Sequence, residues 1–369
     1  SCFLPSVVYY EGDRLFTALD DVPSSASRLD YLKMRLVAEV ERSRAEAWTD
    51  YAAPYPIQVV VSWYLARVLA AVGTRMREIW PNYGQHPEDY CFVNICVPIA
   101  YADGAPVESE LMAALYAART AVGPVGTEAP ALCEIARLLS DRAATVGTVD
   151  YCYSYPETSS NLQSYLKSRS RKPGLYVLLD VGAGTVDLTF FQLLEDTGND
   201  APLRYYHAAV LDAGSSRLEL LTVEIDKRIQ LLDARNYKEG RYANPSSDLV
   251  AAFAAAQKQV HDEVGCGVGQ GVIVTEAKLH SDRRRQLELM KNIRLIFSGG
   301  GFIEHPYERA TRFFQEKRQW IHRAPVERMP EPADLEQKGL DEQVPFRRLS
   351  VAYGLSFPRY ALENHRFPS

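Results

Sequence analysis

The chain has 369 residues, of which 47% are hydrophobic and 24% are charged, the balance of an ordinary soluble globular protein. A formal net charge of −6 at pH 7 gives the chain as a whole no attraction to nucleic acid or to an anionic membrane, and neither partner is expected. The six cysteines form no Cys-x-x-Cys pair, and the seven histidines form no pair four residues apart. A zinc site is therefore not expected, and the thiols fit a reducing, cytoplasmic location.

The first half of the chain is predicted to alternate strands and helices. Residues 4–19 indicate a β-hairpin that turns at Glu11-Gly12-Asp13. Helices are then predicted over residues 26–47, 56–80, 108–121 and 129–143, and strands over residues 91–99 and 148–154. The apolar stretch 57–72 is interrupted by Arg67 and is expected to be too short to span a membrane. A polar connector at 167–174 is expected to separate two lobes.

The second half begins with three successive strands, predicted at 175–181, 185–194 and 203–211, which favour an antiparallel meander. Residues 212–216 are expected to open a helix that ends near residue 231, and the simpler interpretation of this segment is an N-cap by Ser215 or Ser216. A helix over 247–264 is followed by a glycine-rich stretch, 264–270, that is expected to be loose. The remaining elements are a charged helix at 278–291, a strand at 293–297 and helices at 307–318 and 341–362.

The most informative segment is 180–188, DVGAGTVDL, which follows the apolar run 175–179. The run predicts a strand buried on both faces, since it is short, aliphatic and preceded by Pro173 and Gly174. Small residues at 182–184 let the backbone approach a bulky anion, and successive N–H groups in such a turn form an anion-binding concavity. Carboxylates on either side suit a hydrated Mg²⁺ that accompanies a phosphate. The segment predicts a nucleotide phosphate site at a β-hairpin; the alternative is a tight hairpin with two solvated acids.

A second informative segment is 298–301, Ser-Gly-Gly-Gly, which follows the predicted strand at 293–297. Three consecutive glycines remove every Cβ where a flat ring or a sugar could lie on the backbone. The alternative is a flexible connector between a strand and a helix.

Five ordered segments together resemble the nucleotide-binding domain of DnaK-type heat-shock chaperones, within the actin, hexokinase and heat-shock ATPase superfamily. Residues 180–189 are similar to the family's phosphate motif DLGGGTFDVS, and residues 298–301 to its adenosine motif VGGS. The other three segments are 4–15, 97–101 and 349–355, which resemble the family's opening hairpin, its VPAYF strand end and its closing helix AVAYGAA.

The resemblance implies an α/β, two-lobed, actin-like (ribonuclease H-like) ATPase fold, with a mixed sheet flanked by helices in each lobe. Lobe I would span 1–172, with 1–55 a partial outer subdomain and 56–172 its core. Lobe II would span 173–340, with 173–214 and 288–340 as core and 215–287 as outer subdomain. Residues 341–369 would form a C-terminal helix that crosses back to lobe I.

The resemblance also implies a Mg-ATP or ADP site and slow hydrolysis. Magnesium would be held through water by Asp180, and the candidate catalytic residues are Asp187, Glu157 and Lys33. The residues expected to contact the nucleotide are Gly182, Ala183, Gly184, Thr185, Gly214, Gly299, Gly300, Gly301, Ile303 and Lys258.

Departures from the family pattern leave the role open. The first-lobe Asp-x-Gly hairpin is not found in this sequence. Tyr155 stands where the family has a glutamate, with Pro156 matching and Glu157 just beyond, and Ile303 stands where an arginine stacks on adenine. One hypothesis is a weak DnaK-like ATPase that switches partner binding. The other is a catalytically impaired actin-fold scaffold or regulatory subunit, and both imply a protein partner or client. An actin-like filament former is disfavoured by the segments at 97–101 and 349–355.

Overall fold

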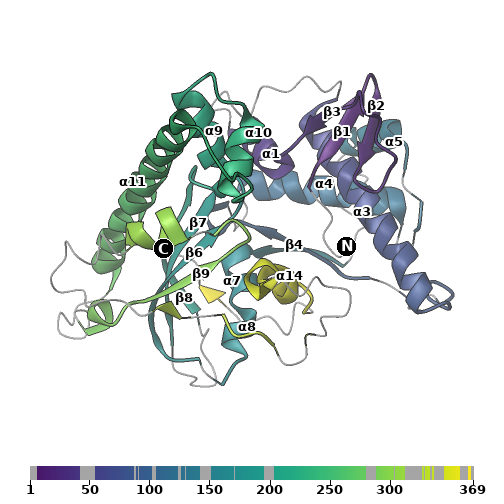
Figure 1. Ribbon diagram of the computed structural model, residues 1–369. Coiled ribbons are helices and arrows are strands. Elements are labelled where there is room, and N and C mark those ends of the chain that lie inside the picture. Colours follow the sequence, from purple (N-terminus) through teal and green to yellow (C-terminus); the bar gives the residue numbers. More distant parts are fainter. Residues whose placement is uncertain are drawn as a thin grey trace. The chain divides into compact units, whose positions relative to one another are not determined.

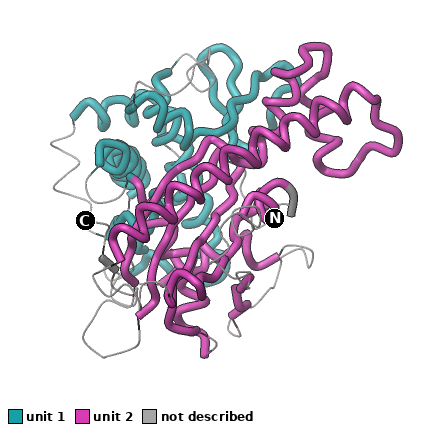
Figure 2. Tube along the Cα trace, turned by 90° about the vertical axis from the view of Figure 1, so that its left-hand side faces the viewer, with its two compact units in different colours: residues 1–97, 101–155, 339–341 teal, residues 98–100, 156–338, 342–369 magenta. Residues whose placement is uncertain are grey.

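The computed structural model describes residues 6–41, 55–86, 89, 91–101, 105–123, 126–128, 130–141, 151–169, 171–194, 203–279, 288–302, 304–311, 326–327, 329–332, 335, 345–357 and 365–366. The chain forms two compact units, shown in different colours in Figure 2. Unit 1 comprises residues 1–97, 101–155 and 339–341, and unit 2 comprises residues 98–100, 156–338 and 342–369. The main boundary between the two compact units thus lies between Tyr155 and Pro156. The boundary between lobes that was predicted from the sequence follows residue 172.

Unit 1 begins with an antiparallel sheet of strand order β2-β1-β3. Its strands are β1 (Val8–Glu11), β2 (Arg14–Thr17) and β3 (Ser27–Leu29), and helix α1 (Leu32–Glu41) follows. The predicted hairpin is confirmed, and its turn contains Gly12 at φ +60°, a conformation that glycine adopts without a Cβ clash. The helix predicted over 26–47 is wrong in its first part. Leu29 pairs with Val8 instead, because the open edge of the hairpin offers backbone partners that the local helical pattern cannot reveal.

Helices α3 (Ile57–Ile79), α4 (Pro106–Val122) and α5 (Leu132–Ser140) form most of the core of unit 1 with β1 and α1. Helix α3 begins directly after Pro56, as predicted, and α4 has a proline at its first position, where no amide is needed. Helix α4 stops at Gly123, whose φ of +76° ends the helix. Strands β4 (Val93–Val97) and β5 (Cys152–Pro156) pair with each other.

Helix α3 is, within the described part of the chain, the one helix long and apolar enough to cross a membrane. The prediction that this stretch is too short is wrong, because the helix continues to Ile79 and has 23 residues. In its most apolar window, 56% of the residues are buried inside the protein, as in a core helix. Val60 and Ala66 are completely buried in the cluster that α3 shares with α4 and α5.

Unit 2 is built on a mixed sheet with strand order β10-β9-β6-β7-β8-β11. Strands β6, β7, β8 and β9 of this sheet are labelled in Figure 1. Its strands are β6 (Gly174–Val181), β7 (Val186–Leu193), β8 (Leu203–Leu211), β9 (Arg294–Ser298), β10 (Val326–Glu327) and β11 (His365–Arg366). The predicted antiparallel meander of β6, β7 and β8 is confirmed, and β6 pairs with β9 in parallel. Residues 175–179 are each no more than 1% exposed, so β6 is buried on both faces as predicted.

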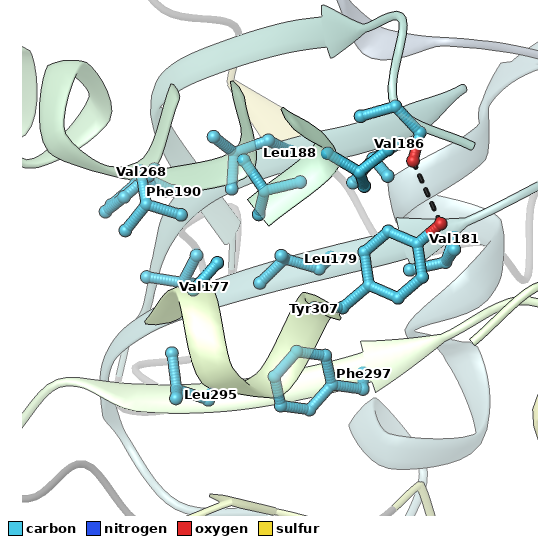
Figure 3. Packing of buried hydrophobic residues seen from close by; sticks show 14 of the residues in the cluster. Val177, Leu179, Val181, Val186, Leu188, Phe190, Val268, Leu295, Phe297 and Tyr307 are labelled. Atoms are coloured by element: carbon cyan, nitrogen blue, oxygen red, sulfur yellow. Dashed lines mark hydrogen bonds between the residues drawn. The ribbon is translucent and has the colours of Figure 1, made fainter. Parts of the chain in front are cut away.

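Helices cover both faces of this sheet. Val177, Leu179 and Leu188 face a cluster that includes side chains of α9 (Ser215–Ile225) and α11 (Ser247–Lys278). Figure 3 shows part of this cluster, with Phe297 and Tyr307 beside β6. Tyr176, Leu178 and Phe191 face the opposite side. Residues of α8 (Gln163–Leu166) cover them, together with Leu162, which follows α7 (Glu157–Asn161). The α/β class with helix-flanked sheets, predicted from the sequence, is confirmed.

Helix α11 continues through the glycine-rich stretch that was expected to be loose. The helix has 32 residues, and Ser246 caps it by accepting a hydrogen bond from the amide of Leu249 at 3.2 Å. A Cβ at Gly267 would lie 2.8 Å from Leu211 Cδ1, and one at Gly271 would clash with the ring of Phe190. The prediction failed because these glycines let the helix approach β7 and β8 closely, a tertiary role that outweighs their poor helix propensity.

The remaining elements are α10 (Leu231–Lys238), the π-helical turn η2 (Glu304–Glu308), the 3-10 turn η3 (Phe346–Arg348) and α14 (Ser350–Leu355). Helix α10 packs on α9, and α14 packs on α7 and α8. Most of the helices predicted at 278–291 and 307–318 lies outside the described residues. Of the helix predicted at 341–362, residues 345–357 are described, and they contain only η3 and α14.

Candidate functional site

The candidate phosphate turn is residues 182–185, which connects β6 to β7. It is a tight hairpin, in which the amide of Gly182 donates to the carbonyl of Thr185 at 2.9 Å. Ala183 is exposed at its tip, whereas Gly184 and Thr185 are buried. The amides of Ala183 and Gly184 donate to no backbone carbonyl in the described part of the chain. Successive amides at the tip of a turn suit an anion, so the residues present fit a phosphate group.

Three glycines from distant segments lie against the phosphate turn. A Cβ at Gly214 would overlap the backbone of Ala183 and Thr185, and one at Gly301 would overlap the carbonyl oxygen of Gly182. Gly299 has φ +86°, and a Cβ there would lie 2.5 Å from Asp180 Oδ1. The amide of Gly301 donates to the carbonyl of Val181 at 2.8 Å. The structure thus brings together the two glycine-rich segments that the sequence singled out, together with Gly214.

Helix α9 also begins on the phosphate turn. The amides of Ser215 and Ser216 donate to the carbonyls of Gly182 and Ala183 at 3.0 and 2.8 Å. The first amides of a helix have no partner within the helix, and here the turn supplies one. The simpler interpretation, a side-chain cap by either serine, is wrong: Gly214 is the N-cap residue and no side chain caps the helix.

An ion-pair cluster connects the N-terminal half of α9 to α10. Glu219 has only 2% of its side chain exposed and pairs with Arg235 at 3.0 Å and with Lys238. The ammonium of Lys238 also donates to the carbonyl of Ser215 at 3.3 Å. Breaking a buried pair of this kind leaves an uncompensated charge, so the cluster fixes α10 to the end of α9 that meets the turn.

Two carboxylates flank the phosphate turn on one face of the sheet. Asp180 lies directly opposite Asp187 in the β6–β7 register, and their exposures are 5% and 7%. Directly opposed residues of an antiparallel pair project to the same face, and like charges in such positions destabilise the pair. A cation shared by the two carboxylates would offset that repulsion, so the donor set fits the predicted magnesium ion. No cluster of three or more metal-binding side chains occurs among the described residues.

A buried hydrogen-bond chain holds Asp180. Asn161 of α7 donates from Nδ2 to Asp180 Oδ2 at 2.7 Å, and its own Oδ1 accepts from Ser298 Oγ at 2.8 Å. The hydroxyls of Ser298 and Ser350 lie 3.1 Å apart. The chain joins α7, the ends of β6 and β9, and α14. No sequence motif indicated Asn161, although it lies only four residues after Glu157.

The other candidate residues are more scattered. Glu157 is half-buried at the first position of α7, four residues before Asn161, and Tyr155 is buried at the end of β5. Lys258 is exposed on α11, and Lys33 lies in unit 1 on α1. Ile303 lies outside the described residues. The structure therefore brings residues 180–187, Gly214 and residues 299–301 into contact with one another. The functional roles of Glu157, Lys33, Lys258 and Ile303 stay predictions.

Tyr307 is a further residue of the site region that the sequence did not reveal. It is completely buried, and its hydroxyl donates to the carbonyl of Ala213 at 3.0 Å, the bond drawn in Figure 3. Burial raises the pKa of its phenol, which stays protonated and able to donate. Tyr307 thus ties η2, which follows the three glycines, to the loop that carries Gly214.

No protein-family model matches the chain, and no curated protein sequence matches it. Among solved structures, the archaeal actin homologue Ta0583 is 14% identical with a TM-score of 0.33, over 55% of this chain and 54% of that one. The chain thus spans about half the length of that protein. MreB5 of Spiroplasma citri, solved with ADP, is 11% identical with a TM-score of 0.47, over 95% of this chain and 87% of that one. The apo psk41 ParM protein is 13% identical with a TM-score of 0.38, over 95% and 80%.

With identities of 11–14% and TM-scores below 0.5, these likenesses carry no argument about the family or the function of this chain. The actin, hexokinase and heat-shock ATPase superfamily stays what the sequence motifs indicate. The narrower resemblance to DnaK-type chaperones rests on the sequence motifs.

Proposed function

We propose that the protein binds an adenine nucleotide, with the phosphates on the phosphate turn and the nucleoside on residues 299–301. The observation that carries the proposal is the contact between these two segments, which are more than a hundred residues apart in the sequence. Gly301 donates to Val181, and Gly299 leaves no room for a side chain beside Asp180. A glycine backbone next to a turn whose amides at Ala183 and Gly184 donate to no backbone carbonyl in the described part of the chain suits a ligand that has both a flat ring and an anion.

Asp180 and Asp187 would hold the magnesium ion, through water in the case of Asp180. When bound, the ion neutralises charge on the phosphate oxygens. Asn161 orients the carboxylate of Asp180 through the 2.7 Å hydrogen bond, and burial keeps bulk water from both carboxylates. Positioning and charge stabilisation account for most phosphoryl-transfer catalysis. The absence of the family's glutamate at Tyr155 therefore favours slow hydrolysis.

The finer proposal is a DnaK-like switch, in which the nucleotide state changes the binding of a protein partner. It is supported by the order of the five motifs and by the connection from the phosphate turn through α9 to α10. A ligand can shift such an equilibrium only through a difference in its affinity for the two states. The second candidate is a scaffold or regulatory subunit, which Tyr155 and Ile303 favour. A partner whose affinity is equal with ATP and ADP would support the scaffold.

The proposal is tested by calorimetric titration with Mg-ADP and Mg-ATP, with and without EDTA, and by thermal melts at millimolar nucleotide. Binding to the native state raises its apparent stability, so the melting temperature should rise with nucleotide and less so with EDTA. Gly300→Val should abolish binding while the protein stays folded, since the three atoms nearest to a Cβ there all belong to the flexible side chain of Arg348. Gly265→Val is the control, because nothing lies within 4 Å of a Cβ at Gly265. A flat titration of the wild type together with unchanged melting would refute nucleotide binding.

A further inference from the structure

A cavity of about 390 Å³ lies where the end of α9, α10 and the start of α11 meet, the three helices labelled in Figure 1. All of its lining residues belong to unit 2, and none of them belongs to the candidate phosphate site. Ile229 and Leu249 are buried and form an apolar inner wall. The charged side chains of the lining are three aspartates and one arginine: Asp226, Asp233, Asp248 and Arg228.

Hydrogen bonds hold the charged lining in place. Arg228 donates to both carboxylate oxygens of Asp226, at 3.0 and 2.7 Å, and to Asp248 at 3.0 Å. Its hydrogen bonds lower the pKa of Asp226 to about 2, so this carboxylate stays charged at neutral pH. The hydroxyl of Tyr242 donates to Asp233. Since a carboxylate can accept about four hydrogen bonds, Asp233 and the 59% exposed Asp248 keep capacity for a ligand.

The charge of this lining favours a cation over an anion. Three carboxylates outnumber one guanidinium, and that guanidinium is already shared by Asp226 and Asp248. The N-terminus of α11 would favour an anion, but Asp248 already occupies its first turn. The other basic side chains of residues 224–250 do not line the cavity: Lys227, Arg235, Lys238 and Arg241.

Exposed apolar side chains lie beside the cavity. Of the thirteen large hydrophobic side chains that are exposed among the described residues, five lie within residues 225–250. They are Ile225, Leu231, Leu232, Tyr242 and Val250. Tyr242 lines the cavity, and each of the others is within two residues of a lining residue, about 8 Å along the backbone at most. Apolar groups gathered in this way beside polar ones mark a site of protein–protein contact.

We propose that residues 225–250 form a docking surface for a partner protein, which inserts a lysine or arginine flanked by aliphatic side chains. The cationic head pairs with Asp233 and Asp248, and its alkyl stem lies against Ile229 and Leu249, because such side chains bury the stem while the charge stays at a polar rim. The flanking aliphatic groups pack on the exposed apolar side chains. This inference goes beyond nucleotide binding and does not depend on it.

The probe is a fluorescently labelled peptide, Gly-Leu-Arg-Leu-Arg-Leu-Gly. Two further peptides carry glutamate in place of arginine, or serine in place of leucine. Fluorescence anisotropy measures the affinity of each for the full chain. The basic apolar peptide should bind at least about tenfold more tightly than either of the others, because each lacks the ion pairs or the apolar contacts.

Two variants locate the binding. Asp248→Asn should weaken binding of the basic apolar peptide about 2- to 5-fold, the effect of one exposed ion pair. Leu232→Ser should weaken it about 3- to 10-fold through the lost apolar contact. The matched controls on α11 are Asp262→Asn and Ile273→Ser, at residues that are 64% and 58% exposed and do not line the cavity. Both controls should stay within about twofold of wild type, and circular dichroism verifies that every variant is folded.

Four results would overturn the proposal. The first is no binding of the basic apolar peptide at about 1 mM. The second is equal affinity for the serine peptide, which would indicate a site for a small cation. The third is full affinity in both Asp248→Asn and Leu232→Ser. The fourth is a wild-type dimer in sedimentation that Leu232→Ser dissociates, which would assign the surface to a second copy of the chain. Failure of nucleotide binding would leave this inference standing, because the two sites share no residue.

Discussion

Replacing Gly271 of α11 by alanine tests the close approach of this helix to the sheet. Alanine favours a helix by about 1 kcal/mol over glycine. A Cβ at Gly271, however, would lie 2.7 Å from Phe190 Cδ2 and 2.8 Å from Cζ, and Phe190 is completely buried. Overpacking of this kind costs about 1–3 kcal/mol. Gly271→Ala should therefore lower stability by roughly 0–2 kcal/mol.

Gly265→Ala provides a matched control in the same helix. Nothing lies within 4 Å of a Cβ at Gly265, so this change should stabilise the protein by about 1 kcal/mol. The two variants should then differ by roughly 1–3 kcal/mol in free energy of unfolding. With a urea m-value of about 2 kcal/mol/M, their midpoints should be separated by roughly 0.5–1.5 M. The loss of helical circular dichroism with urea measures both midpoints. Equal midpoints, or a more stable Gly271→Ala, would refute the packing argument for the glycines of α11.

Three further changes address the site and the pH dependence. Asn161→Ala removes the donor to Asp180 and should destabilise the protein by about 1–3 kcal/mol in urea unfolding; an unchanged midpoint would mean that the hydrogen bond is dispensable. Asp187→Asn should reduce ATP turnover more than Mg-ADP affinity, and equal turnover would leave Asp187 a structural residue of the hairpin. Burial, and then the charge of Lys278, lowers the pKa of His207 below 6.5. The unfolded chain then binds the proton more tightly, so this contribution to stability is complete above about pH 6.5 and is lost as the pH falls. His207→Phe should flatten the stability curve between about pH 7 and 5, and a curve of unchanged slope would contradict the assignment.

The hairpin that contains the phosphate turn was predictable because the residues that determine its conformation lie within the hairpin itself. The run 175–179 predicts a strand by its aliphatic residues, the small residues at 182–184 predict the turn, and the register with β7 then follows. The strand before the three glycines was predictable on the same grounds. Each of these segments specifies its own conformation within about ten residues.

Features that depend on distant partners were missed or were predicted wrongly. The glycine-rich composition of 264–270 predicted a loose stretch. The prediction failed because the glycines of α11 pack against Leu211 and Phe190, which lie in other elements and cannot be identified from the local sequence. The edge pairing of β3 overrode a helical pattern. The contact of Asn161 with Asp180 and that of Arg348 with Gly300 join segments that only the fold brings together. Propensity is a weak guide wherever such tertiary contacts decide the outcome.

The contacts around the phosphate turn lower the conformational entropy that a ligand must remove from the chain when it binds there. The amides of Ser215, Ser216 and Gly301 already hold the carbonyls of residues 181–183 in place. A loop that must be ordered on binding loses about 1–2 kcal/mol of conformational entropy for each residue that is fixed. Here that ordering is complete before the ligand arrives, so the binding energy of a phosphate group is available for affinity. Hydrogen exchange at Gly182 and Gly214 should accordingly be slow in the ligand-free protein.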